Sequence, residues 1–289
     1  MIKKFIILIS FLSFLSVMYF SCSSFTYDDP ENKVRAMNFD YSGNPEIKLS
    51  YLNSSENEVF TLSFDTKLSI GYAYMLGVND QNIFTCTQML SRVALKPSRG
   101  KKIFIHDVFL DTLRYANSVD YVEKTIKGKK VTHSPGFYTH ILISDFSGNT
   151  SILEMSPEKN ELVKKTGDAM VMTNFRLYPF DYKDVQNIYG PGADRYIAMW
   201  NKIEEIKPID SLDKALSILD SSKNYLTCSS AVFFPEEKTI YLCFDGNFDR
   251  IWKILPFEKT VETFMGFEEN RKEMIDSDGI LKSELLSWK

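Results

Sequence analysis

The sequence predicts an α+β protein, in which antiparallel sheets carry helices on their outer faces. The first observation is the order of its segments, because strand-like and helical patterns come in separate blocks: strands, helices, strands, helices, strands. The second is composition: 44% hydrophobic, 14% aromatic and 25% charged residues are typical of a globular chain. The third is the lack of any internal repeat, low-complexity tract or interdomain linker in the sequence.

The first third of the chain is rich in Phe, Tyr, Leu and Val, in runs separated by polar clusters. These clusters contain Gly, Pro, Asn and Ser, which favour turns. We therefore expect an antiparallel meander here rather than a β-α-β series. The predicted strands are 34–41, 47–53, 59–65, 68–76 and 83–90, with a turn at 79–82.

Apolar residues at helical spacing come next along the chain, and strand patterns and helical patterns then alternate. Helices are predicted at 108–116 and 119–126, with Ser118 as a helix N-cap. Strands return at 139–145 and 150–155. The pattern next predicts a helix over 193–206, a second helix capped by Ser211, and a final hairpin over 226–245.

The final hairpin contains two of the four cysteines, Cys228 and Cys243. If Phe234 pairs with Thr239, both cysteines lie on the same face of the hairpin, diagonally across from each other. A disulfide is compatible with this register, but we expect two buried free thiols.

The N-terminus is typical of an export signal. Lys3 and Lys4 precede an uncharged apolar run from Phe5 to Phe20. The run is short for a permanent transmembrane helix, which needs about 20 apolar residues. We predict that residues 1–21 are a signal peptide or propeptide and that 22–289 form a single exported domain, which is periplasmic, extracellular or membrane-anchored.

Charge and residue spacing exclude several classes of function. The formal charge of −4 becomes −6 without Lys3 and Lys4, which argues against nucleic acid as a partner. No Cys-x-x-Cys pair exists, and the three histidines are not spaced as metal ligands, so we expect no metal and no cofactor. A homo-oligomer remains compatible with the sequence, as does membrane association through the N-terminal segment.

Cys22 stands directly after the apolar run and Ser21. Cleavage between Ser21 and Cys22 would make Cys22 the first residue of the mature chain. An N-terminal cysteine combines a nucleophile and a base, because its α-amino group (pKa ~8) can accept the proton of its thiol (pKa ~8.5). Such a residue needs no catalytic histidine.

Five groups of residues follow one another in an order that suggests a family: 22–25 with 37–41, 77–82, 140–149, 172–174 and 194–196. They resemble motifs of the cysteine N-terminal-nucleophile (Ntn) hydrolases of linear amide C–N bonds. This family includes choloylglycine hydrolases, penicillin V acylases, acid-ceramidase-like amidases and acyl-CoA:aminopenicillanate acyltransferases. The resemblance covers nearly all of 22–289. It implies a four-layer αββα sandwich of two antiparallel sheets flanked by helices.

The resemblance also implies an exported amidohydrolase that cleaves a small N-acyl amide through an acyl-thioester on Cys22. Asp40 would hold the α-amine of Cys22, and Asn174 would donate to the oxyanion. Arg195 would steady the carboxylates of the site. Each of these three also has an ordinary explanation: a strand-end turn for Asp40, a turn cap for Asn174 and a solvated helix start for Arg195.

Two positions depart from the family pattern. Met37 stands where the family has an arginine, and Arg35 lies on the same strand face but about 6.5 Å away along the strand. The family's oxyanion asparagine aligns near Met89, so Asn82 and Gln88 are weak candidates for that role. Turn and edge-strand positions explain these two residues equally well.

The abundant Phe and Tyr fit an aromatic acyl pocket and fit an ordinary core as well. The candidate walls of such an acyl pocket are residues 44–57 and 178–192. Two alternative functions stay open: an acyltransferase of the same family, and a membrane-anchored binding lipoprotein with lipidated Cys22. Phe20 makes a poor lipidation signal, and Tyr19 is equally poor for ordinary signal cleavage, which Ser21 suits.

Overall fold

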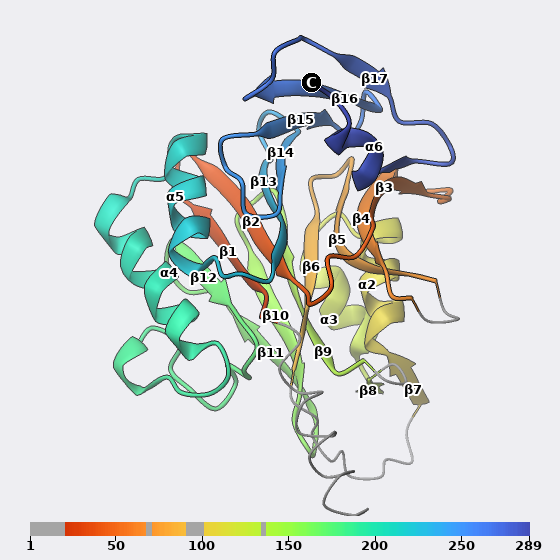
Figure 1. Cartoon of the computed structure of the whole chain (residues 1–289). Coiled ribbons are helices and arrows are strands. Elements are labelled where there is room, and N and C mark those ends of the chain that lie inside the picture. The colour runs from red at the N-terminus through yellow and green to blue at the C-terminus, as the bar shows by residue number, and fades with distance from the viewer. Residues whose placement is uncertain (1–20, 68–70, 91–100, 134–136) are drawn as a thin grey trace, which may run out of the picture.

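Two eight-stranded antiparallel sheets lie face to face between two layers of helices (Figure 1). The computed structural model describes residues 21–67, 71–90, 101–133 and 137–289. The four-layer αββα architecture is the one that the sequence predicted. Within the described residues, no helix is long and apolar enough to cross a membrane.

The first sheet contains the strand that begins beside Cys22. In spatial order its strands are β12 (Ala169–Met172), β1 (Ser23–Asp28), β2 (Lys33–Asp40), β13 (Thr227–Phe234), β14 (Thr239–Phe244), β15 (Ile251–Leu255), β16 (Thr260–Met265) and β17 (Lys272–Met274). Its outer face is covered by α4 (Ala193–Ile206) and α5 (Leu212–Ser222) (Figure 1).

The second sheet forms the other inner layer. Its order is β11 (Asn160–Lys164), β10 (Thr150–Met155), β9 (Thr139–Ser144), β6 (Phe84–Met89), β5 (Tyr72–Asn79), β4 (Val59–Asp65), β3 (Ile47–Leu52) and β18 (Ile280–Leu281). Helices α2 (Ile105–Tyr115) and α3 (Asp120–Ile126) cover its outer face. The remaining elements are the parallel pair β7 (Lys101–Phe104) and β8 (Lys129–Thr132), the 3₁₀ helix η2 (Val185–Asn187) and α6 (Lys282–Leu286).

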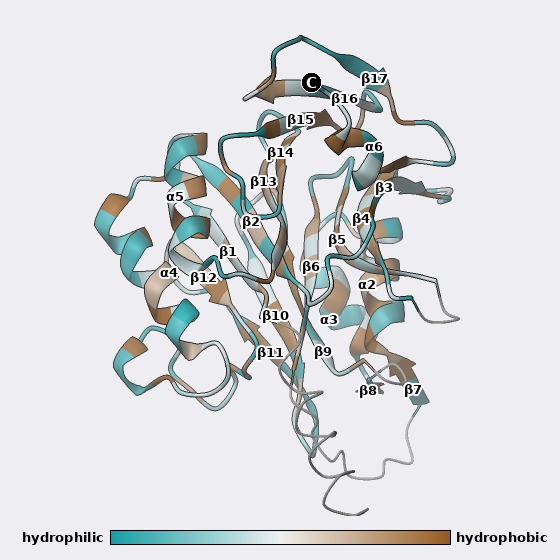
Figure 2. Ribbon diagram, viewed as in Figure 1, coloured by the Kyte–Doolittle hydropathy of each residue, from teal (hydrophilic) through white to brown (hydrophobic). Residues whose placement is uncertain are grey.

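Apolar side chains gather in the two places that this layering creates. The larger cluster lies between the sheets, where the rings of Phe84 and Phe233 stack with centroids 6.4 Å apart. The smaller one lies under α2 and α3 and includes Val108 and Leu113. Figure 2 shows hydrophobic segments, in brown, on the strands of both sheets and on the helices that cover them. Burial of these side chains, at about 25 cal/mol per Å², holds the layers together.

Several predicted elements are confirmed. Helix α4 has the predicted bounds, and the Ser211 hydroxyl caps α5 by accepting the Lys214 backbone N–H at 3.4 Å. In the final hairpin Phe234 pairs with Thr239, and both cysteines are buried free thiols, as expected.

Other predictions were wrong in detail. The strand expected at 34–41 leaves the meander and lies in the first sheet, between β1 and β13, so the meander contains only β3 to β6. The strand expected at 68–76 is β5, which runs from Tyr72 to Asn79, while 68–70 lie outside the described residues. Ser118 caps nothing with its side chain; instead the carboxylate of Asp145 accepts the Val119 N–H that begins α3, at 3.1 Å.

Candidate active site

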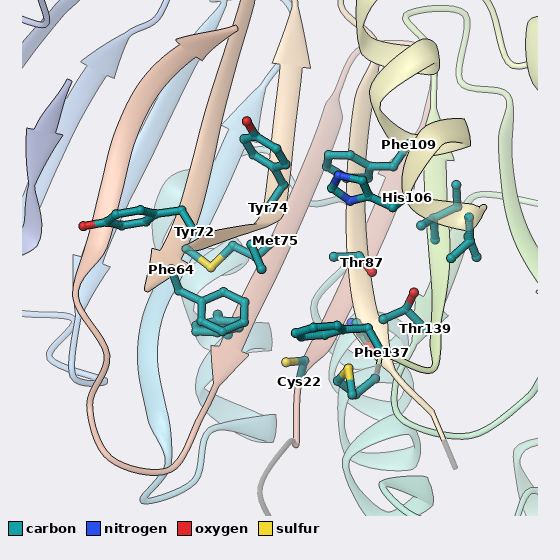
Figure 3. Close-up of a pocket in the computed structure, with 16 residues that line it drawn as sticks. Cys22, Phe64, Tyr72, Tyr74, Met75, Thr87, His106, Phe109, Phe137 and Thr139 are labelled. Atoms are coloured by element: carbon teal, nitrogen blue, oxygen red, sulfur yellow. The ribbon is translucent and has the colours of Figure 1, made fainter. Parts of the chain in front are cut away.

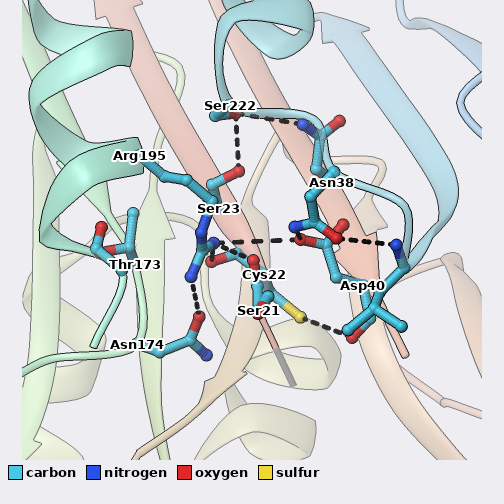
Figure 4. A network of polar contacts seen from close by, with 12 residues as sticks. Ser21, Cys22, Ser23, Asn38, Asp40, Thr173, Asn174, Arg195 and Ser222 are labelled. Carbon is cyan, nitrogen blue, oxygen red and sulfur yellow. Dashed lines mark hydrogen bonds and ion pairs between the residues drawn. The ribbon is translucent and has the colours of Figure 1, made fainter. Parts of the chain in front are cut away.

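Cys22 lies at the start of β1, with only 2% of its surface exposed. Strands β1 and β2 are antiparallel with Ser23 opposite Asn38, so Cys22 comes beside the end of β2. Its Sγ is 3.7 Å from the carbonyl oxygen of Asp40 (Figure 4). Burial, reinforced by the nearby Asp40 carboxylate, raises the pKa of the thiol to about 12.

The Asp40 carboxylate is buried and held on both oxygens. Thr227 Oγ1 donates to one oxygen at 2.7 Å, and Asn224 Nδ2 donates to the other at 2.6 Å. The guanidinium of Arg195 is 4.0 Å away. Burial raises the pKa of Asp40 to about 6, although the Thr227 hydroxyl, Arg195 and Asn224 each pull it down. The sequence analysis did not identify Asn224 or Thr227.

Arg195 lies in the first turn of α4 and points back to the start of β1 (Figure 4). Its Nη1 donates to the carbonyl of Ser21 and to that of Cys22, the latter at 2.6 Å. Its Nη2 donates to Asn174 Oδ1 at 2.8 Å. One guanidinium therefore joins the main chain on both sides of the Ser21–Cys22 bond to the side chains of Asn174 and Asp40.

Gly192 makes room for that guanidinium. Its φ is +83°, and a Cβ at this position would lie 2.5 Å from Nη2 of Arg195. The carbonyl of Gly192 also accepts the hydroxyl of Thr173 at 3.0 Å, which ties the start of α4 to the end of β12. Only glycine combines this backbone angle with this close approach.

Asn174 follows β12 and faces the same site. Its Nδ2 donates to the carbonyl of Met89 at 2.8 Å, and its Oδ1 accepts from Arg195. An amide NH₂ has two hydrogens, so one donor of Asn174 remains in addition to the bond to Met89.

Glu154, on β10, holds the chain that follows Asn174, and the sequence analysis missed this role. Its buried carboxylate accepts the backbone N–H groups of Leu177 (3.0 Å) and Tyr178 (2.9 Å). Nδ1 of His140 lies 2.9 Å from the same carboxylate. His140 belongs to a stretch that resembled the family, which was the available signal for this cluster.

The weaker candidates separate into two groups. Gln88 lies close to Cys22, and its Nε2 donates to the Ser24 hydroxyl at 2.9 Å. Asn82 lies in the turn after β5, at the end of the strand remote from Tyr72, and so is not brought to the site. Arg35 is also elsewhere, since its guanidinium binds the Asp28 carboxylate at 2.5 Å and the Asp145 carbonyl at 3.0 Å.

Met37, at the family's arginine position, is buried in the core between the sheets and adds no charge to the site. The site consequently contains one arginine, Arg195, within the described part of the chain. No group of three or more His, Cys, Asp or Glu residues is arranged to hold a metal ion among the residues that the structure describes.

The thiol of Cys22 opens onto a cavity of about 340 Å³ (Figure 3). The expected walls do not line it: neither 44–57 nor 178–192 contributes, because the cavity lies beside β5 and β6, in the middle of the second sheet. The lining consists of Cys22, Phe39, Phe64, 72–75, 87–89, Ile105, His106, Phe109, Phe137, Thr139 and Ile141.

Comparison of sequences gave no match to a protein-family model and none to a curated protein. Comparison with solved structures found similar proteins. A variant of conjugated bile acid hydrolase from Clostridium perfringens superposes with a TM-score of 0.64 at 14% identity, covering 88% of this chain and all of the other. Penicillin V acylase from Agrobacterium tumefaciens gives a TM-score of 0.56 at 12% identity, covering 80% of this chain and 90% of that one. The chain therefore has the Ntn-hydrolase fold of choloylglycine hydrolases and penicillin V acylases.

Proposed function

We propose that the protein is an exported amidohydrolase that cleaves the C–N bond of a small N-acyl amide, with Cys22 as the nucleophile. One observation carries the proposal. The Cys22 thiol faces a cavity, while Arg195 holds the main chain on both sides of the Ser21–Cys22 bond and Asp40 lies beside it. The fold shared with two kinds of amide-cleaving enzyme supports the reaction class.

Removal of residues 1–21 is the first step of this proposal. With Ser21 attached, the nitrogen of Cys22 is an amide and cannot act as a base. A thiol with a pKa of about 12 is ionised in only about one molecule in 10⁵ at pH 7. Cleavage turns that nitrogen into an amine, which would lie within reach of Asp40 and take the thiol proton.

The chemistry then follows in two halves. The thiolate attacks the acyl carbon, and the new oxyanion accepts a hydrogen bond from the remaining Nδ2 hydrogen of Asn174. The C–N bond breaks, the leaving amine takes the proton held by the Cys22 amine, and an acyl-thioester remains. Water attacks the thioester, gives a proton to the same amine, and releases the acid while the thiol is restored.

The burial of Cys22 bears on the lipoprotein alternative. A diacylglyceryl group on its Sγ would have to fit inside the molecule, since only 2% of the residue is exposed. An acyltransferase would use the same thioester with an amine instead of water as acceptor. Supplying a thioester donor with an amine nucleophile, and measuring amide formation against acid release, separates these two reactions.

Replacing Cys22 tests the proposal directly. Cys22→Ala should abolish turnover of N-acyl amides, because no other described thiol lines the cavity. Cys243→Ala is the matched control, since Cys243 is a buried free thiol of the same sheet that does not line the cavity. Full activity of Cys22→Ala would overturn the proposal, as would a lipid adduct on Cys22 in the intact mass of the mature protein.

A further inference from the structure

Strands β5 and β6 are neighbours in the second sheet, but they pair over only part of their length. Their paired residues are Leu76 with Cys86, Gly77 with Thr85 and Val78 with Phe84. Beyond these, β5 stays paired to β4 as far as Tyr72, and β6 stays paired to β9 as far as Met89. The sheet therefore divides into two arms, residues 72–75 and 87–89, which we call the sheet fork.

A β-bulge accounts for the fork. Leu62 of β4 pairs with Leu76, but the next residue, Ser63, pairs with Tyr74. Met75 is therefore an extra residue on β5. A bulge bends its strand and increases the local twist, and so turns the arm that contains Tyr72 away from β6.

The cavity at Cys22 lies in this fork and reaches both faces of the sheet (Figure 3). On the inner side it is lined by Cys22 and by Phe39 of the first sheet. On the outer side it is lined by Ile105 and Phe109, which belong to the helix that covers the outer face. Cys22 is thus connected, between two strands, to the space beneath α2.

The lining favours an uncharged occupant. None of the described side chains around the cavity is Asp, Glu, Lys or Arg. Among the described lining residues the one basic side chain is His106, which stacks on Tyr74 with centroids 5.8 Å apart, and burial lowers its pKa. A charged group would lose its hydration here without gaining a partner of opposite charge.

We propose that the fork accepts the acyl group of the substrate, which runs from the Cys22 sulfur between the arms and ends beneath α2 beside Phe109. This rests on the proposed amide hydrolysis and narrows its substrates to N-acyl amides with an unbranched apolar chain. Both arms keep their hydrogen bonds to β4 and β9, so the backbone limits the width of the opening. A polymethylene chain, which has neither branches nor fused rings, needs the smallest separation between the arms.

Chain length is the first test. On the mature protein, kcat/KM for N-acylglycines with acyl chains from two to sixteen carbons should rise about fourfold per methylene until the chain fills the cavity, and then level off. Phe109→Ala should move the levelling point to longer chains. Leu113→Ala is the matched control, because Leu113 is a buried residue of the same helix that does not line the cavity. An unchanged levelling point in Phe109→Ala, or the same displacement in both variants, overturns the inference.

Alkylation provides a test that needs neither hydrolysis nor a variant of α2. With an N-alkyl iodoacetamide the sulfur of Cys22 forms a bond to carbon, iodide leaves, and the thiol proton passes to solvent. Relative to glutathione, the N-octyl reagent should label Cys22 at least about tenfold faster than the N-methyl reagent, with Cys22→Ala as the unlabelled reference. Equal rates overturn the fork as an acyl site. A clear octyl preference in a protein that hydrolyses no amide would support the site and reject the proposed function.

Discussion

In the proposed reaction the Asp40 carboxylate, although buried, has to be ionised to hold an ammonium group. The bond from Thr227 is the largest of the influences that lower its pKa. Thr227→Val keeps the shape and removes that donor, so the pKa of Asp40 should rise by about one unit further. A carboxyl group is charged only above its pKa. The acid limb of kcat/KM should therefore move to higher pH by about one unit relative to the parent protein.

A pH–rate profile measures that displacement, and Thr239→Val is its control. Thr239 is a buried threonine of the same hairpin whose hydroxyl donates to the backbone carbonyl of Glu237, far from Asp40. Its replacement should leave the acid limb in place. If Thr227→Val has the acid limb of the parent, ionisation of Asp40 does not control the reaction.

At this scale the sequence analysis named four candidate site residues and missed the residues that support them. Cys22, Asp40, Asn174 and Arg195 were identified by family-like motifs in the right order, and the structure brings the four together. The hydrogen bond from Thr227 to Asp40 depends on the pairing of β13 with β2, and no local sequence pattern predicts that long-range pairing.

At the scale of elements, the junction between β12 and α4 decides where the guanidinium of Arg195 lies. Gly192→Ala would place a methyl group against that guanidinium and strain a backbone with φ of +83°. Loss of the Arg195 position should lower kcat by about 10²-fold, comparable to removal of one oxyanion donor. Gly128→Ala is matched for strain, with φ of +69° and no atom near the added carbon.

Steady-state kinetics and thermal unfolding together separate the two effects. Both glycine variants should lose about 1 kcal/mol of stability, because alanine is strained in the left-handed region. Only Gly192→Ala should lose kcat. Equal kcat in the two variants would mean that Arg195 finds another position or has no part in turnover.

Amphipathic elements were the ones that the sequence predicted well. Helix α4 shows apolar residues at helical spacing and was predicted with its observed bounds. Strand β1 was not predicted, because polar residues on it are buried and satisfied by distant partners: Ser23 bonds Ser222 of α5 at 2.8 Å, and Thr26 bonds Thr150 of the other sheet at 3.3 Å. Strand periodicity detects apolar alternation and cannot detect such a network.

At the scale of the whole molecule, the four layers place the start of β1 inside the protein. Ser21, which precedes Cys22, therefore also lies at the site. Arg195 holds the carbonyls of both Ser21 and Cys22, so the bond between these residues lies within the site. A protein that retains Ser21 has every side chain of the site and lacks only the free amine. Sequence patterns suggested cleavage at this bond, but its position beside Asp40 and Arg195 results from the packing of α4 on the first sheet.

Two proteins that differ by a single residue test this dependence on the amine. One begins at Cys22 and the other at Ser21, each released from a cleavable fusion and verified by intact mass. The protein that begins at Cys22 should hydrolyse N-acyl amides, whereas the one with Ser21 should be at least about 10³-fold slower, because its thiol has a pKa of about 12 and no adjacent base. Equal unfolding temperatures would show that both are folded. Turnover by the Ser21 protein while its mass stays unchanged would mean that another group activates the thiol, and the role assigned to the α-amine would be wrong.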